Sequence, residues 1–76
     1  MTEDISALMT RNKNNMLLLR LRNDKTIRGR LHDFDMHMNL VLIGAEDISD
    51  AEPKKLGKIL LRGDNILSVS LPEERQ

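Results

Sequence analysis

The sequence predicts a small, mostly β domain, in which one short helix precedes five short antiparallel strands that form a strongly bent sheet. Most apolar residues alternate with polar ones, which is the period of a strand with one buried face. Segments rich in Asn, Asp and Gly separate these runs, as they do between hairpin strands. The chain has 76 residues, 39% of them hydrophobic, which supplies one core and not two.

The composition excludes several classes of site. The chain has no cysteine, which excludes disulfides, cysteine-based zinc fingers, iron–sulfur clusters and thiol nucleophiles. No apolar run approaches the length of a membrane span, and the N-terminus lacks the features of a signal peptide. We therefore expect a cytoplasmic protein with no membrane association, no metal and no cofactor.

Charge is balanced overall but unevenly distributed. The 12 basic and 12 acidic residues cancel, which argues against a protein that coats nucleic acid by charge alone. Residues 11–31 nevertheless hold seven basic residues and one acidic residue, and residues 32–52 hold six acidic residues with no Lys or Arg. Segments of opposite charge suit a sheet that pairs within itself or with its copies. The alternative is an ordinary mixed, solvated surface.

The helix is expected over residues 2–11. Thr2 is the predicted N-cap, and Ile5, Leu8 and Met9 fall at the spacing of one apolar stripe. The asparagines at 12, 14 and 15 then end the pattern.

The first two strands are expected at residues 16–22 and 26–35, joined by a short turn at 23–25. The apolar phase of the second strand slips, because Phe34 lies three residues after Leu31 instead of two. A glycine inside this strand, Gly29, together with the slip predicts a bulge or a sharp bend.

Three further strands are expected at residues 39–45, 57–62 and 65–71, with a polar, variable loop at 47–56 and a tight turn at Gly63-Asp64. The third and fourth strands have runs that are apolar on both faces, namely Leu40 to Ile43 and Ile59 to Leu61. Such strands in so small a chain indicate that neighbouring copies cover them. We therefore expect an oligomer.

The loop before residue 40 concentrates polar side chains. On one continuous strand, Asp33, Asp35 and His37 would share a face and could bind a metal ion or perform acid–base chemistry. Their spacing matches no zinc or calcium motif, so we favour Asp33 or Asp35 as turn-forming residues that cap the backbone. A metal-dependent hydrolase is kept as a third hypothesis.

Three side chains, His37 among them, fit the recognition of a nucleobase. With one Phe and no Tyr or Trp in the chain, His37 is an imidazole on an exposed loop that could stack on a base. The amide of Asn39 complements the imide edge of uracil. Arg62, just before the turn at Gly63, presents a flat cation able to stack from the opposite side.

Two motifs carry a resemblance to a known family. The segment 13–46, with DMHMNL at 35–40, resembles the first conserved segment of the Sm and Sm-like proteins, and KILLRGDNI at 58–66 resembles the second. The resemblance divides one domain, 1–76, into a helix (2–11), a first motif (13–46), a variable loop (47–56), a second motif (57–71) and a tail (72–76). The compact loop makes the chain most similar to an archaeal Sm-like protein.

This resemblance implies the Sm fold, an SH3-like small barrel, and a function without catalysis. It implies a closed homo-oligomeric ring, a heptamer with a hexamer as the alternative, in which the fourth strand of one copy pairs with the fifth strand of the next. It also implies binding of uridine-rich single-stranded RNA at the inner rim of the pore, as a scaffold for ribonucleoprotein complexes and RNA processing, with protein partners in that processing.

The resemblance assigns a role to each matching residue. His37 would stack on the base, Asn39 would read the uracil edge, and Arg62 would stack from the other side. Gly63 would allow the close turn, and Asp64 would orient Asn39. The rival hypothesis is a ring that serves only as a protein-interaction module, with incidental RNA binding, which the neutral total charge and scarce aromatics favour.

Overall fold

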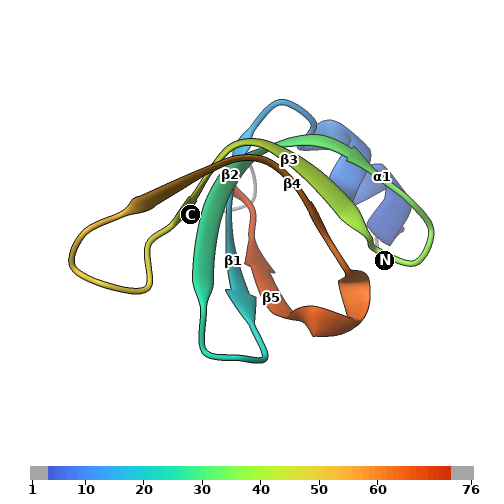
Figure 1. Ribbon diagram of the computed structural model, residues 1–76. Coiled ribbons are helices and arrows are strands. Elements are labelled where there is room, and N and C mark those ends of the chain that lie inside the picture. Colours follow the sequence, from blue (N-terminus) through green and yellow to red (C-terminus); the bar gives the residue numbers. More distant parts are fainter. Residues whose placement is uncertain (1–3, 73–76) are drawn as a thin grey trace.

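The computed structural model describes residues 4–72, which form one helix and a single five-stranded antiparallel sheet (Figure 1). The elements are α1 (Ile5–Arg11), β1 (Met16–Leu21), β2 (Thr26–Phe34), β3 (Leu40–Asp47), β4 (Lys54–Leu61), a 3-10 turn (Gly63–Asn65) and β5 (Ile66–Ser70). The sheet order is β4-β3-β2-β1-β5. The helix and the β3–β4 loop lie at opposite ends of the curved sheet. The predicted fold class is confirmed.

The core lies on the concave side of the sheet and is built by alternate residues of the first three strands. In β1, every second residue is buried, and β2 repeats the pattern. The buried set consists of Met9, Leu17, Leu19, Leu21, Ile27, Leu31, Leu40, Leu42 and Ala45. Only one of these residues comes from α1, so the sheet is held together mainly by its own inner face.

The sheet bends at the position that the sequence predicts. The pairing of β2 with β3 shifts register between Arg28 and Arg30, and again between Leu31 and Asp33. A Cβ at Gly29 would lie 3.1 Å from Leu42 Cβ, so the missing side chain lets β3 pass close to the bend. Register shifts of this kind increase the local twist and curl a small sheet on itself.

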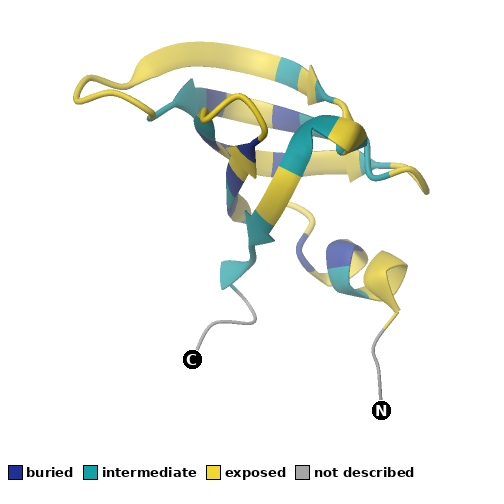
Figure 2. Ribbon diagram, turned by 90° about the horizontal axis from the view of Figure 1, so that it is seen from below, coloured by how far each residue is buried: buried dark blue, intermediate teal, exposed yellow. Residues whose placement is uncertain are grey.

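The two edge strands leave large apolar side chains in solvent. Both β4 and β5 end the sheet order. Most residues of β4 are exposed, whereas those of β5 are exposed or half-buried (Figure 2). Leu60 of β4 is 66% exposed and Leu67 of β5 is 57% exposed. An edge with unpaired backbone groups and apolar side chains is a surface suited to another strand.

The helix differs from the expectation at its start. Its N-cap is Asp4, whose carboxylate accepts a hydrogen bond from the Ser6 N–H at 3.2 Å, whereas the predicted cap, Thr2, lies outside the described residues. Ile5 was expected on the buried stripe, but its side chain is 60% exposed. The helix has seven residues, and Met9 is the one that is buried.

The β3–β4 hairpin is longer than predicted. The polar loop expected at 47–56 is confined to residues 48–53, because β3 continues to Asp47 and β4 begins at Lys54. Asp47 lies opposite Lys54, and Glu46 lies opposite Lys55. Cross-strand pairs of opposite charge stabilise strands that their polarity alone would assign to a loop.

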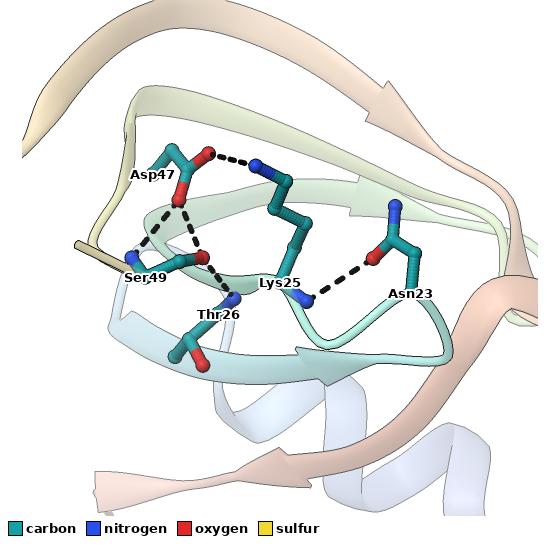
Figure 3. Close-up of polar contacts among 5 residues, drawn as sticks. All are labelled: Asn23, Lys25, Thr26, Asp47 and Ser49. Carbon is teal, nitrogen blue, oxygen red and sulfur yellow. Dashed lines mark hydrogen bonds and ion pairs between the residues drawn. The ribbon is translucent and has the colours of Figure 1, made fainter.

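Polar contacts bind this hairpin to the β1–β2 turn (Figure 3). The Ser49 hydroxyl accepts a hydrogen bond from the Thr26 N–H at 2.8 Å and donates one to Asp47 at 2.6 Å. Lys25 Nζ lies 3.6 Å from the other Asp47 oxygen. The Ser49 hydrogen bonds lower the pKa of Asp47 below its usual value, with Lys25 adding a smaller contribution. These contacts join two turns that meet at the same end of the sheet.

Candidate nucleic-acid interface

The first part of the candidate site is the loop between β2 and β3. The Asp35 N–H donates to the Asn39 carbonyl at 3.1 Å, and the Met38 N–H donates to the Asp35 carbonyl at 3.0 Å. Met38 has a φ of +63°, which turns the chain back toward β3. The side chain of Met38 packs against the core while Met36 is exposed. The loop is therefore a tight turn that the Met38 side chain anchors to the core.

The Asp35 carboxylate organises this loop. Its Oδ1 accepts hydrogen bonds from the His37 N–H at 2.9 Å and the Asn39 N–H at 3.0 Å, and its Oδ2 accepts one from Asn39 Nδ2 at 3.0 Å. These bonds favour the charged form, so they lower the pKa of Asp35, the Asn39 side chain contributing most. The prediction that Asp35 caps the backbone of a turn is confirmed.

The second part of the site is the 3-10 turn between β4 and β5. The Asn65 N–H donates to the Arg62 carbonyl at 3.0 Å and closes the turn. Arg22, just after β1, donates from Nε to the Asp64 carbonyl at 2.7 Å and from its N–H to the Asn65 carbonyl at 2.9 Å. The turn is therefore tied to the end of β1 as well as to its own strands.

The two loops meet at Gly63. Its N–H donates to Asn39 Oδ1 at 2.8 Å. A Cβ added at Gly63 would lie 2.1 Å from the His37 carbonyl oxygen and 2.9 Å from the Met38 carbonyl carbon. No side chain fits in that space, so glycine is required here by contact with another segment. The predicted close turn at Gly63 and the meeting of the two loops are both found.

The amide of Asn39 has a defined orientation. Its oxygen faces a backbone N–H and its nitrogen faces a carboxylate, so a flipped amide would place donor against donor and acceptor against acceptor. An amide has two N–H donors and an oxygen with two lone pairs. One donor and one acceptor site are used, which leaves one of each. This remaining pair is complementary to the imide edge of a uracil.

His37 lies two residues before Asn39, Arg62 directly precedes Gly63, and both residues are exposed. Arg62 Nη2 lies 3.5 Å from Asp64 Oδ2, but the two side chains are 76% and 73% exposed, so this ion pair is weak and does not immobilise the guanidinium. The structure places the backbone of His37 against Gly63, directly after Arg62. An imidazole and a guanidinium are thus held on adjacent loops.

The role assigned to Asp64 is wrong. Its side chain contacts Arg62, and the groups that orient Asn39 are Asp35 and the Gly63 N–H. Asp35 lies four residues before Asn39, within the reach of one tight turn, whereas the Asp64 carboxylate lies 3.5 Å from the Arg62 guanidinium. The sequence signal for Asp35 was present in its turn-forming chemistry, but its second bond to the amide was missed.

Asp33, Asp35 and His37 do not share a strand face, because β2 ends at Phe34. Asp33 Oδ1 accepts a hydrogen bond from the Phe34 N–H at 2.9 Å and lies 3.5 Å from Lys13 Nζ, and these contacts lower its pKa. Within residues 4–72, no three His, Cys, Asp or Glu side chains are grouped as metal ligands would be.

Comparison with known proteins gives a consistent result. The model of the LSM domain matches residues 7–71. A protein of Pyrococcus horikoshii described as snRNP Sm-like is 48% identical over 59 residues, which are 76% of this chain and 79% of the relative. In the part of the chain that the structure describes, no helix is long and apolar enough to cross a membrane.

Two solved structures have the same fold. The crystal structure of a heptameric archaeal Sm protein has a TM-score of 0.81 at 38% identity. The superposition covers 86% of this chain and 96% of the archaeal chain. The Pyrococcus abyssi Sm protein, solved in complex with a uridine heptamer, has a TM-score of 0.83 at 40% identity. The superposition covers 91% of this chain and 99% of the Pyrococcus chain. The chain belongs to the LSM domain family, and the relatives described above are archaeal Sm-like proteins.

Proposed function

We propose that copies of this chain assemble into a seven-membered ring that binds uridine-rich single-stranded RNA at the inner rim of its pore. The ring acts as a scaffold for ribonucleoprotein complexes and RNA processing, and the proposal contains no catalytic step. The proposal also includes the division of the domain into two motifs, a cytoplasmic location and protein partners in RNA processing.

The observation that carries the proposal is the anchored amide of Asn39. Its free donor and acceptor match uracil, and its orientation is set by Asp35 and the Gly63 N–H before any ligand arrives. A preorganised hydrogen-bonding pair discriminates between bases, because the wrong base leaves it unpaired. His37 and Arg62, exposed on the two joined loops, supply flat surfaces for stacking.

The edge strands support the ring. The sheet ends in β4 on one side and β5 on the other, and each edge exposes a leucine. Pairing β4 of one copy with β5 of the next satisfies the backbone groups of both edges and covers Leu60 and Leu67. This contact is head-to-tail, so repeating it gives a closed ring when the rotation closes. Its heptameric relative supports seven copies.

A ring multiplies a weak site. Stacking of one base contributes roughly 1–3 kcal/mol. Seven copies of the site, each holding one uridine, convert the later binding steps into intramolecular ones and raise the overall affinity without a new contact. The proposal therefore predicts that affinity for oligo-uridine rises steeply with length up to about one nucleotide per subunit.

The test combines native mass spectrometry with fluorescence anisotropy. We expect a heptamer that binds one uridine heptamer, and a preference for oligo-uridine over oligo-adenosine of equal length at the same salt concentration. Equal affinity for the two oligomers would overturn the uracil-reading role. A ring with no saturable RNA binding would favour the rival hypothesis, a protein-interaction module.

A further inference from the structure

The residue that follows β1, Arg22, contacts the 3-10 turn of the candidate site at two points. Its backbone N–H donates to the Asn65 carbonyl at 2.9 Å, and its Nε donates to the Asp64 carbonyl at 2.7 Å. Two consecutive carbonyls of the turn therefore accept hydrogen bonds from one residue of a distant part of the chain. These bonds fix the orientation of the turn relative to β1, in addition to the bond that closes the turn on itself.

An irregularity in the pairing of β1 with β5 brings the turn within reach of Arg22. The two strands lie side by side (Figure 1), and Arg20 of β1 lies opposite Ser68 of β5. The next residue of β1, Leu21, lies opposite Ile66, so β5 contains one extra residue at this point. The turn that precedes Ile66 is therefore one position nearer to Arg22 than in a regular ladder. Bulges of this kind re-aim groups beside functional sites.

The turn that Arg22 contacts carries two groups of the candidate site. The Gly63 N–H donates to Asn39 Oδ1 at 2.8 Å and helps to set the orientation of that amide. Arg62 directly precedes Gly63 and carries the guanidinium proposed to stack on the base. A displacement of the turn would therefore move the stacking group and the partner of the Asn39 amide together.

The charge of Arg22 is not compensated by the part of the protein that the structure describes. Arg22 is exposed, and within residues 4–72 no carboxylate forms an ion pair with it. Two roles are open to such a side chain, namely a hydrogen bond to the turn and attraction of a phosphate. The geometry favours the first, because the bond from Nε is short and the backbone of the same residue binds the next carbonyl.

We propose that Arg22 is a positioning residue of the uridine site, which acts through its Nε hydrogen bond to the turn and not through its charge. The inference rests on the proposed function for its ligand and adds a residue outside the two loops of the site. The bond keeps Arg62 beside the base and the Gly63 N–H against Asn39. Groups that are fixed before RNA binds need less ordering, so loss of this bond weakens both stacking and base discrimination.

Three substitutions separate the hydrogen bond from the charge. Glutamine carries its amide nitrogen on Cδ, where arginine carries Nε, so Arg22→Gln keeps the donor and removes the charge. Arg22→Lys keeps the charge and places a carbon at that position. Arg22→Met removes both. Fluorescence anisotropy measures the affinity of each ring for heptamers of uridine and of cytidine over a range of salt concentrations.

The two hypotheses about Arg22 predict opposite orders of affinity. We expect Arg22→Lys and Arg22→Met to bind oligo-uridine about three- to tenfold more weakly than wild type, the effect of one lost hydrogen bond, and Arg22→Gln to recover most of this loss. The two weakened variants also lose part of their preference for uridine over cytidine, because the partner of the Asn39 amide is displaced. The slope of log K against log salt stays that of wild type in all three, because no phosphate contact is removed.

The matched control is Lys25→Met, which removes a charge from the same β1–β2 turn. Lys25 Nζ contacts Asp47 and not the 3-10 turn (Figure 3). We expect this variant to keep the affinity, the uridine preference and the salt slope of wild type. Native mass spectrometry and circular dichroism show whether each variant remains a folded ring.

Amide exchange followed by NMR in the RNA-free ring gives a readout that does not depend on the ligand. The Gly63 N–H is expected to exchange faster than wild type in Arg22→Lys and Arg22→Met, and close to wild type in Arg22→Gln. Unchanged exchange in Arg22→Met would overturn the inference, whether or not the ring binds RNA.

The binding data distinguish failure of the inference from failure of the proposed function. Full affinity of Arg22→Lys with weak binding by Arg22→Gln, and a salt slope smaller by about 0.7 in the latter, would assign Arg22 to a phosphate and overturn the inference. Full affinity of Arg22→Met would overturn it as well. In both cases the proposed function stands. Failure of wild type to bind oligo-uridine would overturn the proposed function, and with it the role of Arg22 in RNA binding.

Discussion

Asn39 accepts a hydrogen bond from the Gly63 N–H at 2.8 Å, across 24 residues of sequence, and this bond joins the two loops of the candidate site. The same amide donates to Asp35, so one side chain links both loops and retains groups for a ligand. The site is therefore built by the fold before any ligand binds, which reduces the ordering cost of recognition.

The first prediction concerns the Asn39 amide. Asn39→Ala removes the donor and acceptor proposed to pair with uracil, so we expect the affinity for a short oligo-uridine to fall about tenfold or more, ~1.4 kcal/mol. We also expect the preference for uridine over cytidine to disappear, because stacking tolerates either base. Anisotropy titrations with both oligomers measure the two effects. A variant that binds weakly but keeps its full preference would contradict the assigned role.

The second prediction concerns the contact at Gly63. In Gly63→Ala the new Cβ meets the His37 carbonyl oxygen, a backbone atom that cannot move without the loop. We expect a loss of unfolding free energy of about 1–3 kcal/mol, the usual cost of overpacking, and weaker oligo-uridine binding. Denaturant unfolding and anisotropy measure these effects.

The matched control for Gly63 is Gly44→Asn on β3, which is not an edge strand. Gly44 has open space around it and a φ of +60°, a conformation that asparagine adopts more readily than other side chains. Its substitution is expected to leave RNA binding unchanged. If Gly63→Ala binds and unfolds like wild type, the close approach of the two loops is not maintained in solution.

The sequence was sufficient to predict the strands wherever one face is buried. β1 and β2 alternate cleanly, and the slip between Leu31 and Phe34 marks a real change of register. The start of β4 was missed because Lys54 and Lys55 look like loop residues in isolation. They become strand residues because Asp47 and Glu46 lie opposite them, and that pairing is a property of the folded hairpin.

The site was predictable to a similar degree. The spacing of Asn39 and Gly63 within the two motifs indicated which loops matter, and the structure brings those loops together. The partner of the Asn39 amide was not predictable, because it depends on a tight turn with a positive φ at Met38. Arg22 was not identified either, since nothing in its local sequence indicates the bond to the Asp64 carbonyl.

The third prediction concerns the protonation of Asp35. Its hydrogen bonds with Asn39 and the His37 N–H lower its pKa below the ordinary value of 3.8. The folded state therefore holds this proton less tightly than the unfolded chain. The resulting stabilisation is present above about pH 4 and is lost as the pH falls through the folded pKa. Carboxyl carbon NMR titration is expected to show the lowered pKa, and Asn39→Ala to raise it toward 3.8.

Asp35→Asn separates two roles of this carboxylate, which caps backbone N–H groups of the loop and orients the Asn39 side chain. The substituted amide can still accept the His37 and Asn39 N–H groups, but its nitrogen cannot accept from Asn39 Nδ2. We expect uridine preference to fall while the ring persists. Asp33→Asn is the control, because Asp33 also has a lowered pKa but caps Phe34 away from the amide. An equal loss of preference in both variants would show a general effect of charge.

The fourth prediction separates charge from shape at Arg62. Its exposed ion pair with Asp64 contributes little, so Arg62→Ala is expected to change the unfolding free energy by less than about 0.5 kcal/mol. Binding of oligo-uridine is expected to fall by about 1–3 kcal/mol for each stacked base. Arg62→Lys keeps the charge but not the planar guanidinium, so it should recover only the salt-dependent part of the affinity. Full recovery by lysine would exclude stacking as the role of Arg62.

The last prediction concerns the ring edge. Leu60 is 66% exposed on β4, and pairing with β5 of a neighbouring copy would bury it. Leu60→Glu places an unpaired charge in that contact, so we expect the ring to dissociate while each copy keeps its fold, because Leu60 lies outside the buried core. Native mass spectrometry and circular dichroism report assembly and fold separately. Ile5→Glu is the matched control, since Ile5 is 60% exposed on α1, away from both edges. A ring that survives Leu60→Glu would show that the copies associate through another surface. If the variant is folded but monomeric and still binds oligo-uridine as wild type does, one copy is sufficient for binding.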